Sequence, residues 1–312
     1  MSMKNETQNT CFSNGNLIIT GEYFVLTGAK ALAVPLKFGQ QMVVSCSKDD
    51  KPSIHWKATE NGKPWFSVNF KSESLNIIDS NNTEIALGLQ KLLSVALRFK
   101  PLLFSEDSSY HFLSNIQFST NWGWGSSATL ISNIANWAGI DPFELNKQVS
   151  LGSGYDIAAS NSATPIVYQL TKDGREITPV AFNPVFRKNI YFVYLGKKQK
   201  TSTSIEKNIE TVRRENMVLL ITALTEKITT EDNLDEFIRC IVEHEIIISR
   251  TLKIPRVKSE YFNDFDGEIK SLGAWGGDFA MVVSQLPEMH IRNYFRKKGL
   301  EIFFGFDEII KN

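Results

Sequence analysis

The sequence contains few of the residues that build disulfide frameworks or metal centres. Three cysteines occur in 312 residues, and Cys11, Cys46 and Cys240 are scattered and odd in number. A disulfide framework or a cysteine zinc site is therefore not expected. The four histidines show no metal-ligand spacing, and His244 lies in a helix-like stretch where we interpret it as structural. Because no G-x-S-x-G or H-E-x-x-H motif is present, the sequence also disfavours a hydrolase.

An excess of charge and a long apolar run are also missing. The 34 basic side chains balance the 34 acidic ones, so no general attraction to nucleic acid or to a membrane surface is expected. No apolar run approaches the roughly 18 residues of a membrane span. The first ten residues are polar and lack the apolar core of a signal peptide. We therefore expect a cytoplasmic protein, either a monomer or a homodimer, with no nucleic-acid or membrane partner.

Hydrophobic residues make up 42% of the chain, enough for about two domains. Strand-like and helix-like segments are mixed without regular alternation, which favours an α+β fold. The composition shifts near residue 196. Strands are expected within 15–47, 53–56, 65–70, 110–119, 165–170, 190–195, 279–284 and 300–304. Within the first range, one strand is expected to run on through residues 21–26, Pro35 separates two further strands, and Asn61-Gly62 later forms a hairpin turn. Helices are expected over 83–99, 205–225, 233–252 and 287–298, and a helix-compatible run ends at Ala138.

The most informative stretch, residues 121–138, reads NWGWGSSATLISNIANWA. Gly123 and Gly125 precede two serines and a run with helical apolar spacing. Glycines let the backbone approach an anion, and the free N–H groups and dipole of a helix start favour phosphate. Ser126 and Ser127 can cap the helix or offer a hydroxyl to nucleotide-bound Mg²⁺. The alternative is an ordinary glycine turn with a serine N-cap.

Two further glycine-rich segments accompany this one. Residues 150–160 read SLGSGYDIAAS and carry a single carboxylate, Asp156, near their end. Residues 270–278 read KSLGAWGGD and lead into an apolar strand. Three glycine-rich loops, each next to a strand or a helix, are stronger evidence for a functional site than a single glycine turn, which can arise by chance.

With these motifs in order, the sequence resembles the GHMP kinase superfamily of small-molecule kinases over essentially the whole chain. The first motif, P-G-K-L followed by G-E-Y/H, corresponds to residues 14–17 and 21–23. The second, P-x-x-x-G-L-G-S-S-A, corresponds to residues 123–128, and the third, K-x-x-G-A-G-G-G-D, to residues 270–278. Gly-Glu-Tyr in the first motif and the aspartate that closes the third look most like phosphomevalonate kinases.

The resemblance implies a two-domain α+β fold. It comprises a ribosomal-protein-S5-like amino-terminal domain over 1–188, which carries the nucleotide phosphate loop, and a ferredoxin-like carboxyl-terminal domain over 189–312. It also implies an ATP- and Mg²⁺-dependent kinase that phosphorylates phosphomevalonate or mevalonate in isoprenoid biosynthesis. The alternatives are a sugar or homoserine kinase, a diphosphomevalonate decarboxylase, and a catalytically weakened nucleotide- or metabolite-binding homologue.

The residues that the resemblance implies as nucleotide-binding, metal-binding or catalytic lie mainly in the second motif and in the segment that follows it. Asp156 is the expected catalytic carboxylate, although it can instead stabilise its own turn. Ser127 and Glu144 are the candidate metal ligands, Glu144 with the alternative of a surface helix glutamate. The expected nucleotide loop consists of Gly123, Trp124, Gly125, Ser126, Ser127 and Ala128.

The expected substrate-binding residues come from all parts of the chain. Lys197 belongs to a basic, hydroxyl-rich loop that suits an anionic substrate but is equally typical of a solvated turn. Glu22 and Tyr23 are expected near substrate, with a structural role as the alternative. The full set is Glu22, Tyr23, Ser153, Gly154, Lys197, Gly273, Ala274, Gly276 and Gly277.

The sequence departs from the family pattern in two ways. Asn16 stands where family members usually have the lysine that supports the catalytic aspartate and phosphate charge. We therefore count Asn16 among the catalytic positions, with Lys270, Lys197 or Lys30 as replacement cations. Trp124 and Trp275 replace small or aliphatic residues of the glycine motifs, and such rings can stack on adenine, narrow a pocket or fill core.

Overall fold

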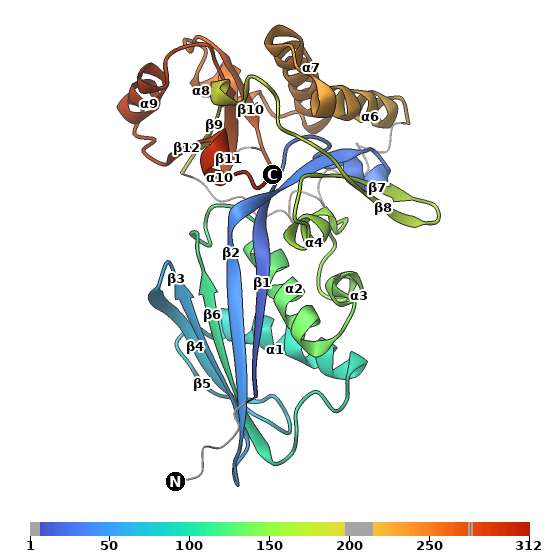
Figure 1. The fold of residues 1–312 in the computed structure, drawn as a ribbon, viewed down its shortest axis with the longest axis vertical. Helices are drawn as coiled ribbons and strands as arrows, with labels where there is room; N and C mark the ends of the chain where they lie inside the picture. The colour runs from blue at the N-terminus through green and yellow to red at the C-terminus, as the bar shows by residue number, and fades with distance from the viewer. Residues whose placement is uncertain (1–6, 197–214, 274, 276) are drawn as a thin grey trace. The chain divides into compact units, whose positions relative to one another are not determined.

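The computed structural model describes residues 7–196, 215–273, 275 and 277–312 (Figure 1). The chain forms two compact units, and each gathers separate stretches of sequence. Unit 1 contains residues 7–15, 38–120 and 125–161, and unit 2 contains residues 16–37, 121–124 and the described part of 162–312. The predicted boundary between residues 188 and 189 falls inside unit 2.

Unit 1 is built on a twisted sheet with the strand order β5-β4-β3-β6-β2 (Figure 1). The second half of β2 pairs antiparallel with β6, and β6 pairs parallel with β3. The β3–β4 hairpin turns at Asn61 and Gly62, whose φ values of 50° and 77° fit a two-residue hairpin turn, as the sequence predicts. Its elements are β1 (Thr7–Ile18, shared with unit 2), β2 (Ala31–Lys48, also shared), β3 (Ser53–Glu60), β4 (Lys63–Lys71), β5 (Ile77–Ser80), α1 (Thr83–Phe99), β6 (Ser108–Ile116), α2 (Ser126–Ala138), α3 (Pro142–Lys147) and α4 (Tyr155–Ser160).

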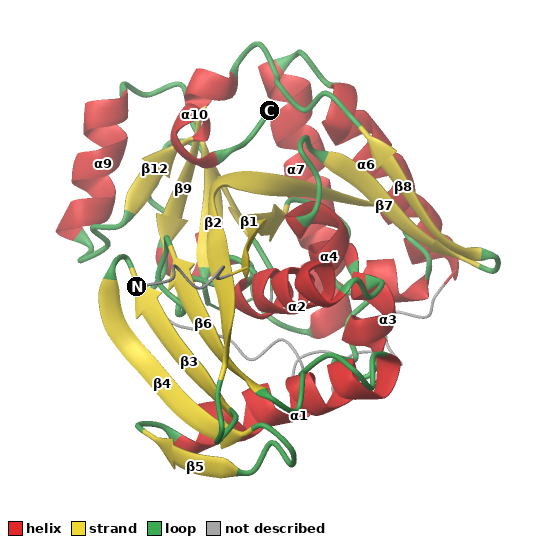
Figure 2. Cartoon of the chain, turned by 60° about the horizontal axis from the view of Figure 1, so that its bottom comes forward, coloured by secondary structure: helices red, strands yellow, loops and turns green. Residues whose placement is uncertain are grey.

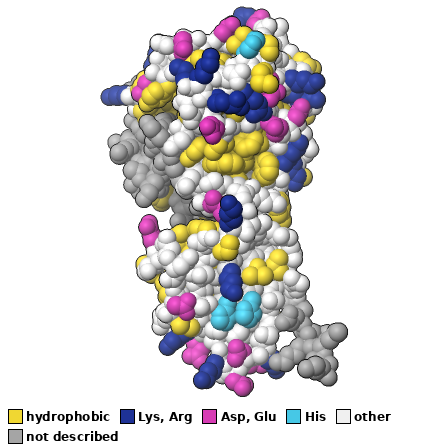
Figure 3. All heavy atoms as spheres, turned by 90° about the vertical axis from the view of Figure 1, so that its left-hand side faces the viewer, with side chains coloured by type: hydrophobic (Ala, Val, Ile, Leu, Met, Phe, Trp, Pro, Cys, Tyr) yellow, Lys and Arg dark blue, Asp and Glu magenta, His cyan; other side chains and the backbone are white. Residues whose placement is uncertain are grey.

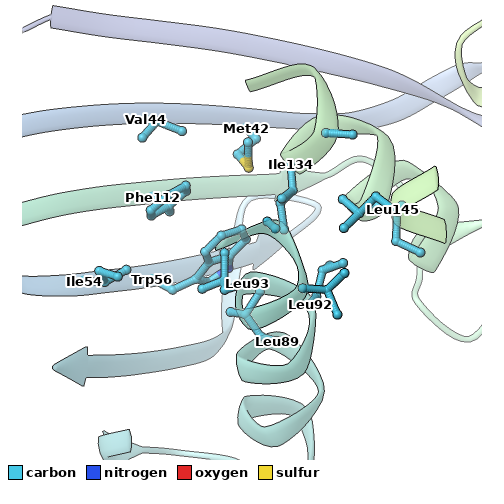
Figure 4. Close-up of a cluster of buried hydrophobic side chains, with 14 of the residues drawn as sticks. Met42, Val44, Ile54, Trp56, Leu89, Leu92, Leu93, Phe112, Ile134 and Leu145 are labelled. Carbon is cyan, nitrogen blue, oxygen red and sulfur yellow. The ribbon is translucent and has the colours of Figure 1, made fainter. Parts of the chain in front are cut away.

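The core of unit 1 lies between one face of this sheet and helices α1 and α2 (Figure 2). Trp56 and Phe112 stack with ring centroids 4.8 Å apart, and Leu93 of α1 and Ile134 of α2 belong to the same cluster (Figure 4). Burial of each large apolar side chain contributes about 1.5–3 kcal/mol. Unit 1, which carries α2, is therefore held by an extensive apolar core.

Unit 2 contains a four-stranded antiparallel sheet with the order β10-β11-β9-β12. A hairpin, β7–β8, pairs with the first residues of β2. Helix α7 packs against α6 and β10. The remaining elements are η1 (Phe24–Thr27), β7 (Ile166–Thr171), β8 (Gly174–Pro179), η2 (Arg187–Asn189), β9 (Ile190–Tyr194), α6 (Glu215–Thr230), α7 (Leu234–Leu252), α8 (Val257–Tyr261), β10 (Glu268–Ser271), β11 (Phe279–Val283), α9 (Glu288–Lys297), β12 (Phe303–Gly305) and α10 (Phe306–Ile309).

Two expectations about local structure are wrong. Residues 21–26 do not continue a strand, because Gly21 and Tyr23 adopt φ values of 86° and 62°, and the 3-10 helix η1 follows. Pro35 does not separate two strands, because β2 runs through it. The ladder of β2 with β7 ends at Ala33 and that with β6 begins at Gln40, so the missing N–H of proline costs neither ladder a hydrogen bond.

The helix expected over 205–225 is described from Glu215 onward as α6, and its earlier part lies outside the described residues. Within the described chain, no helix is both long and apolar enough to cross a membrane. Acidic and basic side chains are interspersed on the face drawn in Figure 3, which agrees with the balanced composition.

Candidate active site

The glycine loop ends at Gly125, which is the N-cap of α2 in a left-handed conformation with φ 76°. The helix start is therefore capped by glycine and not by a serine, and no side-chain hydrogen bond occupies the N-cap. Ser126 and Ser127 form the first turn, where Ser127 is exposed and Ser126 is half-buried. Ala128 is buried and anchors the turn in the core of unit 1. The amide groups of this first turn are suited to bind an anion.

Gly123 packs closely against the third motif within unit 2. A Cβ atom built on Gly123 would lie 2.6 Å from Cγ of Asp278, and the φ value of Gly123 is 68°. Only glycine fits this position without a shift of one loop. Burial and the charge of Asp278 raise the pKa of Tyr194, whose hydroxyl donates to the Asn121 carbonyl oxygen over 3.1 Å. The second and third motif loops therefore lie together at this point.

Both unusual tryptophans are core residues of unit 2. Trp124 is fully buried among Trp122, Phe279 and Phe304, with its ring 5.1 Å from that of Phe279. Trp275 is 3% exposed and belongs to a cluster with Tyr23, Phe24, Ala29, Ile221, Ile248 and Leu252. Of the interpretations that the sequence left open, the structure therefore favours core filling over stacking on a nucleotide.

Asn16, at the position of the expected family lysine, lies on β1 and is 3% exposed. Its backbone N–H donates to the Trp124 carbonyl oxygen over 3.1 Å. The first-motif strand is thereby bound to the glycine loop within unit 2. Of the proposed replacement cations, Lys30 pairs with Glu226 on α6, Lys270 is fully buried, and Lys197 lies outside the described residues.

Asp156 lies in the first turn of α4, a helix whose N-cap is Gly154 with φ 89°. The Ser153 hydroxyl oxygen accepts from the Tyr155 N–H over 3.4 Å, and Asp156 Oδ1 accepts from the Ile157 N–H over 3.0 Å. Asp156 is partly buried, and desolvation raises the pKa of its carboxyl group. A carboxylate with a raised pKa is a stronger general base at neutral pH.

Helix α4 is bound to α2, and Asp156 lies in unit 1 together with the start of α2. The Asn161 side chain, at the C-cap of α4, donates to the Ser132 hydroxyl oxygen of α2 over 2.9 Å. The Asn14 side chain of β1 donates to the Ser160 carbonyl oxygen over 3.4 Å. These contacts fix the orientation of the helix that carries the expected base.

Glu144 is exposed on α3, whose N-cap Asp141 accepts from the Phe143 and Glu144 N–H groups. In the described part of the chain, no group of three or more histidine, cysteine or acidic side chains is arranged to hold a metal ion. A Mg²⁺ ion at Ser127 would also take ligands from nucleotide phosphates and water, as nucleotide-bound Mg²⁺ commonly does.

Glu22 lies in a buried ionisable cluster with His244, Glu245 and Lys270. Glu22 is 2% exposed and the other three are fully buried. The Lys270 ammonium donates to Glu22 Oε1 and to the Ser271 carbonyl oxygen. His244 Nε2 accepts from the Gly21 N–H over 3.1 Å and lies 3.3 Å from Glu22 Oε2. Glu245 Oε1 accepts from the Ser271 N–H over 3.2 Å.

Burial controls the ionisation of this cluster. It raises the pKa of Glu22 although the Lys270 ammonium opposes the rise, and it lowers the pKa of His244 well below its ordinary value. It also raises the pKa of Glu245 to about 8, with Lys270 again opposing. Glu245 is therefore mainly protonated and His244 neutral at pH 7.

Sequence reasoning gave no site role to Asp278, His244 or Glu245. One signal was available, because Ile241, His244, Glu245 and Ile248 follow the helical period and so place two ionisable residues on an apolar helix face. Among the other expected substrate residues, Gly273 is half-buried with φ 66°, Gly277 is buried, and Ala274 and Gly276 lie outside the described residues.

No family model and no curated protein matches the chain by sequence. Solved structures do match it over nearly its full length. The mevalonate kinase of Methanococcus jannaschii has a TM-score of 0.69 at 14% identity, with 99% of this chain and 100% of that chain covered. The phosphomevalonate kinase of Streptococcus pneumoniae, in complex with phosphomevalonate and AMPPNP, has a TM-score of 0.69 at 14% identity and coverages of 94% and 98%.

The L. major mevalonate kinase in complex with R-mevalonate gives a TM-score of 0.68 at 12% identity and coverages of 98% and 97%. The chain therefore has the fold of the mevalonate and phosphomevalonate kinases, which is the GHMP kinase fold that the three motifs predict. The predicted α+β class and the resemblance are confirmed at the level of the fold.

Proposed function

We propose that this protein is an ATP-dependent kinase that transfers the terminal phosphoryl group of ATP to the oxygen of a small alcohol or phosphate monoester. One observation carries the proposal: unit 1 places the glycine-capped start of α2 and the partly buried Asp156 on helices that are bound to each other. Phosphoryl transfer requires positioned phosphates and a group that accepts the proton of the attacking hydroxyl. These two features supply both requirements.

The roles follow from the local geometry. The first-turn amides at Ser126 and Ser127 bind phosphate oxygens, and the exposed Ser127 hydroxyl is available to a nucleotide-bound Mg²⁺. The metal, when bound, supplies charge neutralisation on the phosphates. Asp156 accepts the proton of the substrate hydroxyl, because its raised pKa matches that task better than an ordinary carboxylate does.

For the substrate we propose phosphomevalonate or mevalonate. The first and third motifs, with Gly-Glu-Tyr and a closing aspartate, resemble phosphomevalonate kinases, and the matched structures include kinases of both substrates.

One observation favours a second candidate, a nucleotide- or metabolite-binding protein with weakened catalysis. Asn16 is buried where the resemblance predicts a lysine, and Lys270 is engaged by Glu22. A cation missing beside developing negative charge lowers the rate of transfer more than it lowers binding.

The test measures ATP consumption with Mg²⁺ across phosphomevalonate, mevalonate, homoserine and galactose, together with calorimetric binding of a non-hydrolysable ATP analogue. Asp156→Asn removes the base, and Asp173→Asn, the same change at an exposed turn between β7 and β8, is the matched control. We expect turnover of one substrate that Asp156→Asn abolishes and Asp173→Asn retains. If wild type binds the analogue without any turnover, and Asn16→Lys restores turnover, the second candidate is established instead. If the protein neither binds the analogue nor turns over any substrate, both candidate functions are refuted.

A further inference from the structure

Helix α7 fastens two motif segments of unit 2 through adjacent side chains. His244 Nε2 accepts the backbone N–H of Gly21, which precedes Glu22 and Tyr23 of the first motif. Glu245 Oε1 accepts the backbone N–H of Ser271, where the third-motif loop begins. These bonds join residues that are 223 and 26 positions apart in sequence. One turn of one helix therefore holds both loops by their backbones.

This arrangement is a poor one for stability alone. Four ionisable groups are buried, and apolar side chains of similar size generally form a core that is at least as stable. Furthermore, among the described residues, His244 Nδ1, Glu245 Oε2 and Glu22 Oε2 have no hydrogen-bond partner. An unsatisfied buried polar atom carries a desolvation penalty. The cluster is thus better explained by the backbone geometry that it imposes than by the energy that it contributes.

That geometry reaches the glycine loop through the third motif. Lys270 donates to the Ser271 carbonyl oxygen, and Glu245 accepts from the Ser271 N–H. Both backbone polar groups of Ser271 are therefore hydrogen-bonded to side chains. The loop closes where the Leu272 N–H donates to the Phe279 carbonyl oxygen over 3.1 Å. Its last residue, Asp278, lies against Gly123 with no room for a Cβ. Ser271 and Gly123 are therefore connected through Asp278 of the third motif.

We propose that His244 and Glu245 are positioning residues, which hold the first- and third-motif loops, and through Asp278 the glycine loop, in the geometry that binds nucleotide. The inference rests on the proposed function for its kinetic consequence, but the anchoring of Gly21 and Ser271 can be measured without any turnover.

The ionisation of Glu245 gives the proposal a distinctive signature. Glu245 is surrounded by Lys270 and Glu268 of β10, Glu22 of the first motif, and Arg256, which precedes α8. His244, its neighbour on α7, is neutral. Because the pKa of Glu245 is raised to about 8, alkaline pH adds a second buried carboxylate charge beside that of Glu22. Lys270 then lies beside the carboxylates of Glu22 and Glu245, and the hydrogen bonds from Lys270 and Glu245 to the Ser271 backbone change in strength.

The experiment compares wild type with Glu245→Ala, Glu245→Gln and the control Glu243→Gln, which makes the same change at an exposed position of α7. Glutamine keeps an oxygen that can accept from Ser271 but cannot ionise. The first measurement is amide hydrogen exchange of peptides that contain Gly21 and Ser271, corrected for intrinsic rates. The second is kcat and KM for ATP between about pH 6.5 and pH 9, a range centred near this group's pKa.

We expect Glu245→Ala to accelerate exchange at Ser271 about tenfold and to lower kcat/KM about tenfold or more. Glu245→Gln should match wild type at pH 7 and lack its alkaline loss of activity, and Glu243→Gln should match wild type throughout. Unchanged exchange in Glu245→Ala overturns the proposal, as does faster exchange with wild-type kcat and KM at every pH.

If wild type transfers no phosphoryl group to any tested substrate, the proposed function fails, and the affinity of the ATP analogue replaces the kinetics. Analogue binding weakened about tenfold in Glu245→Ala, with faster exchange at Ser271, would then still support the positioning role. Unaltered binding would overturn it.

Discussion

Glu245→Gln should make the protein more resistant to unfolding at alkaline pH. The ordinary pKa of a glutamate is 4.5, and that of Glu245 in the folded chain is about 8. Between these values the folded state keeps a proton that the unfolded chain has released, so wild type loses stability as pH rises through this interval. The slope is about 1.4 kcal/mol per pH unit, and it flattens as the folded group itself ionises near its pKa.

From about pH 6.5 to pH 8, this amounts to about 1.5 kcal/mol that wild type loses and Glu245→Gln keeps. For a unit of this size the difference corresponds to about 3–6 °C in Tm. Scanning calorimetry at a series of pH values measures it, with Glu243→Gln as the control for removal of one acidic side chain from α7. His244 and Glu22 are present in both proteins, so their contributions cancel to first order in the comparison. A Tm difference that stays constant across this range would show that Glu245 ionises normally and would refute the argument.

Three further predictions concern the glycine loop and the base. Asp156→Asn should lower kcat by about 10²–10⁴ while analogue affinity is retained; normal turnover would exclude Asp156 as the base. Gly123→Ala should lower Tm and analogue affinity because its Cβ meets Asp278, whereas Gly62→Ala, with a similar φ but open space, should show only the backbone strain of about 1–2 kcal/mol. Trp124→Leu should lower the free energy of unfolding by up to about 3–5 kcal/mol, the cost of truncating a buried tryptophan to alanine, without weakening analogue binding to the folded protein. A loss of affinity at unchanged stability would indicate stacking on adenine.

Elements with strong local signals could be predicted from the sequence. The helix expected over 83–99 coincides with α1, because apolar periodicity, the Asn82 cap and Pro101 all act within a few residues of its ends. The β3–β4 turn follows from Asn61-Gly62 in the same way. The three glycine motifs predicted the fold, since their order along the chain identified an arrangement that composition alone could not specify.

The features that were missed depend on distant partners. Lys270 and Glu22 are 248 positions apart, and no local sequence pattern predicts that they form an ion pair. The positive φ of 62° at Tyr23 also has no local turn signal, and its side chain belongs to a buried cluster with Trp275 and Ile248, which are distant in sequence. For a similar reason the chemical role of a buried lysine could not be judged from its motif.

The source of positive charge is the main question that the structure sharpens. Lys270 is unsuited to neutralise phosphate, because withdrawing it would leave Glu22 as an unpaired buried carboxylate at a cost of about 3–5 kcal/mol. Lys30 is different: its pair with Glu226 is partly exposed, and breaking such a pair costs at most about 1 kcal/mol. Among the described replacement candidates, Lys30 is therefore the cation that can be released cheaply. If Lys30→Met leaves turnover unchanged, Lys30 is not the replacement cation, and the amides at the start of α2, the bound metal or another basic side chain supplies the positive charge.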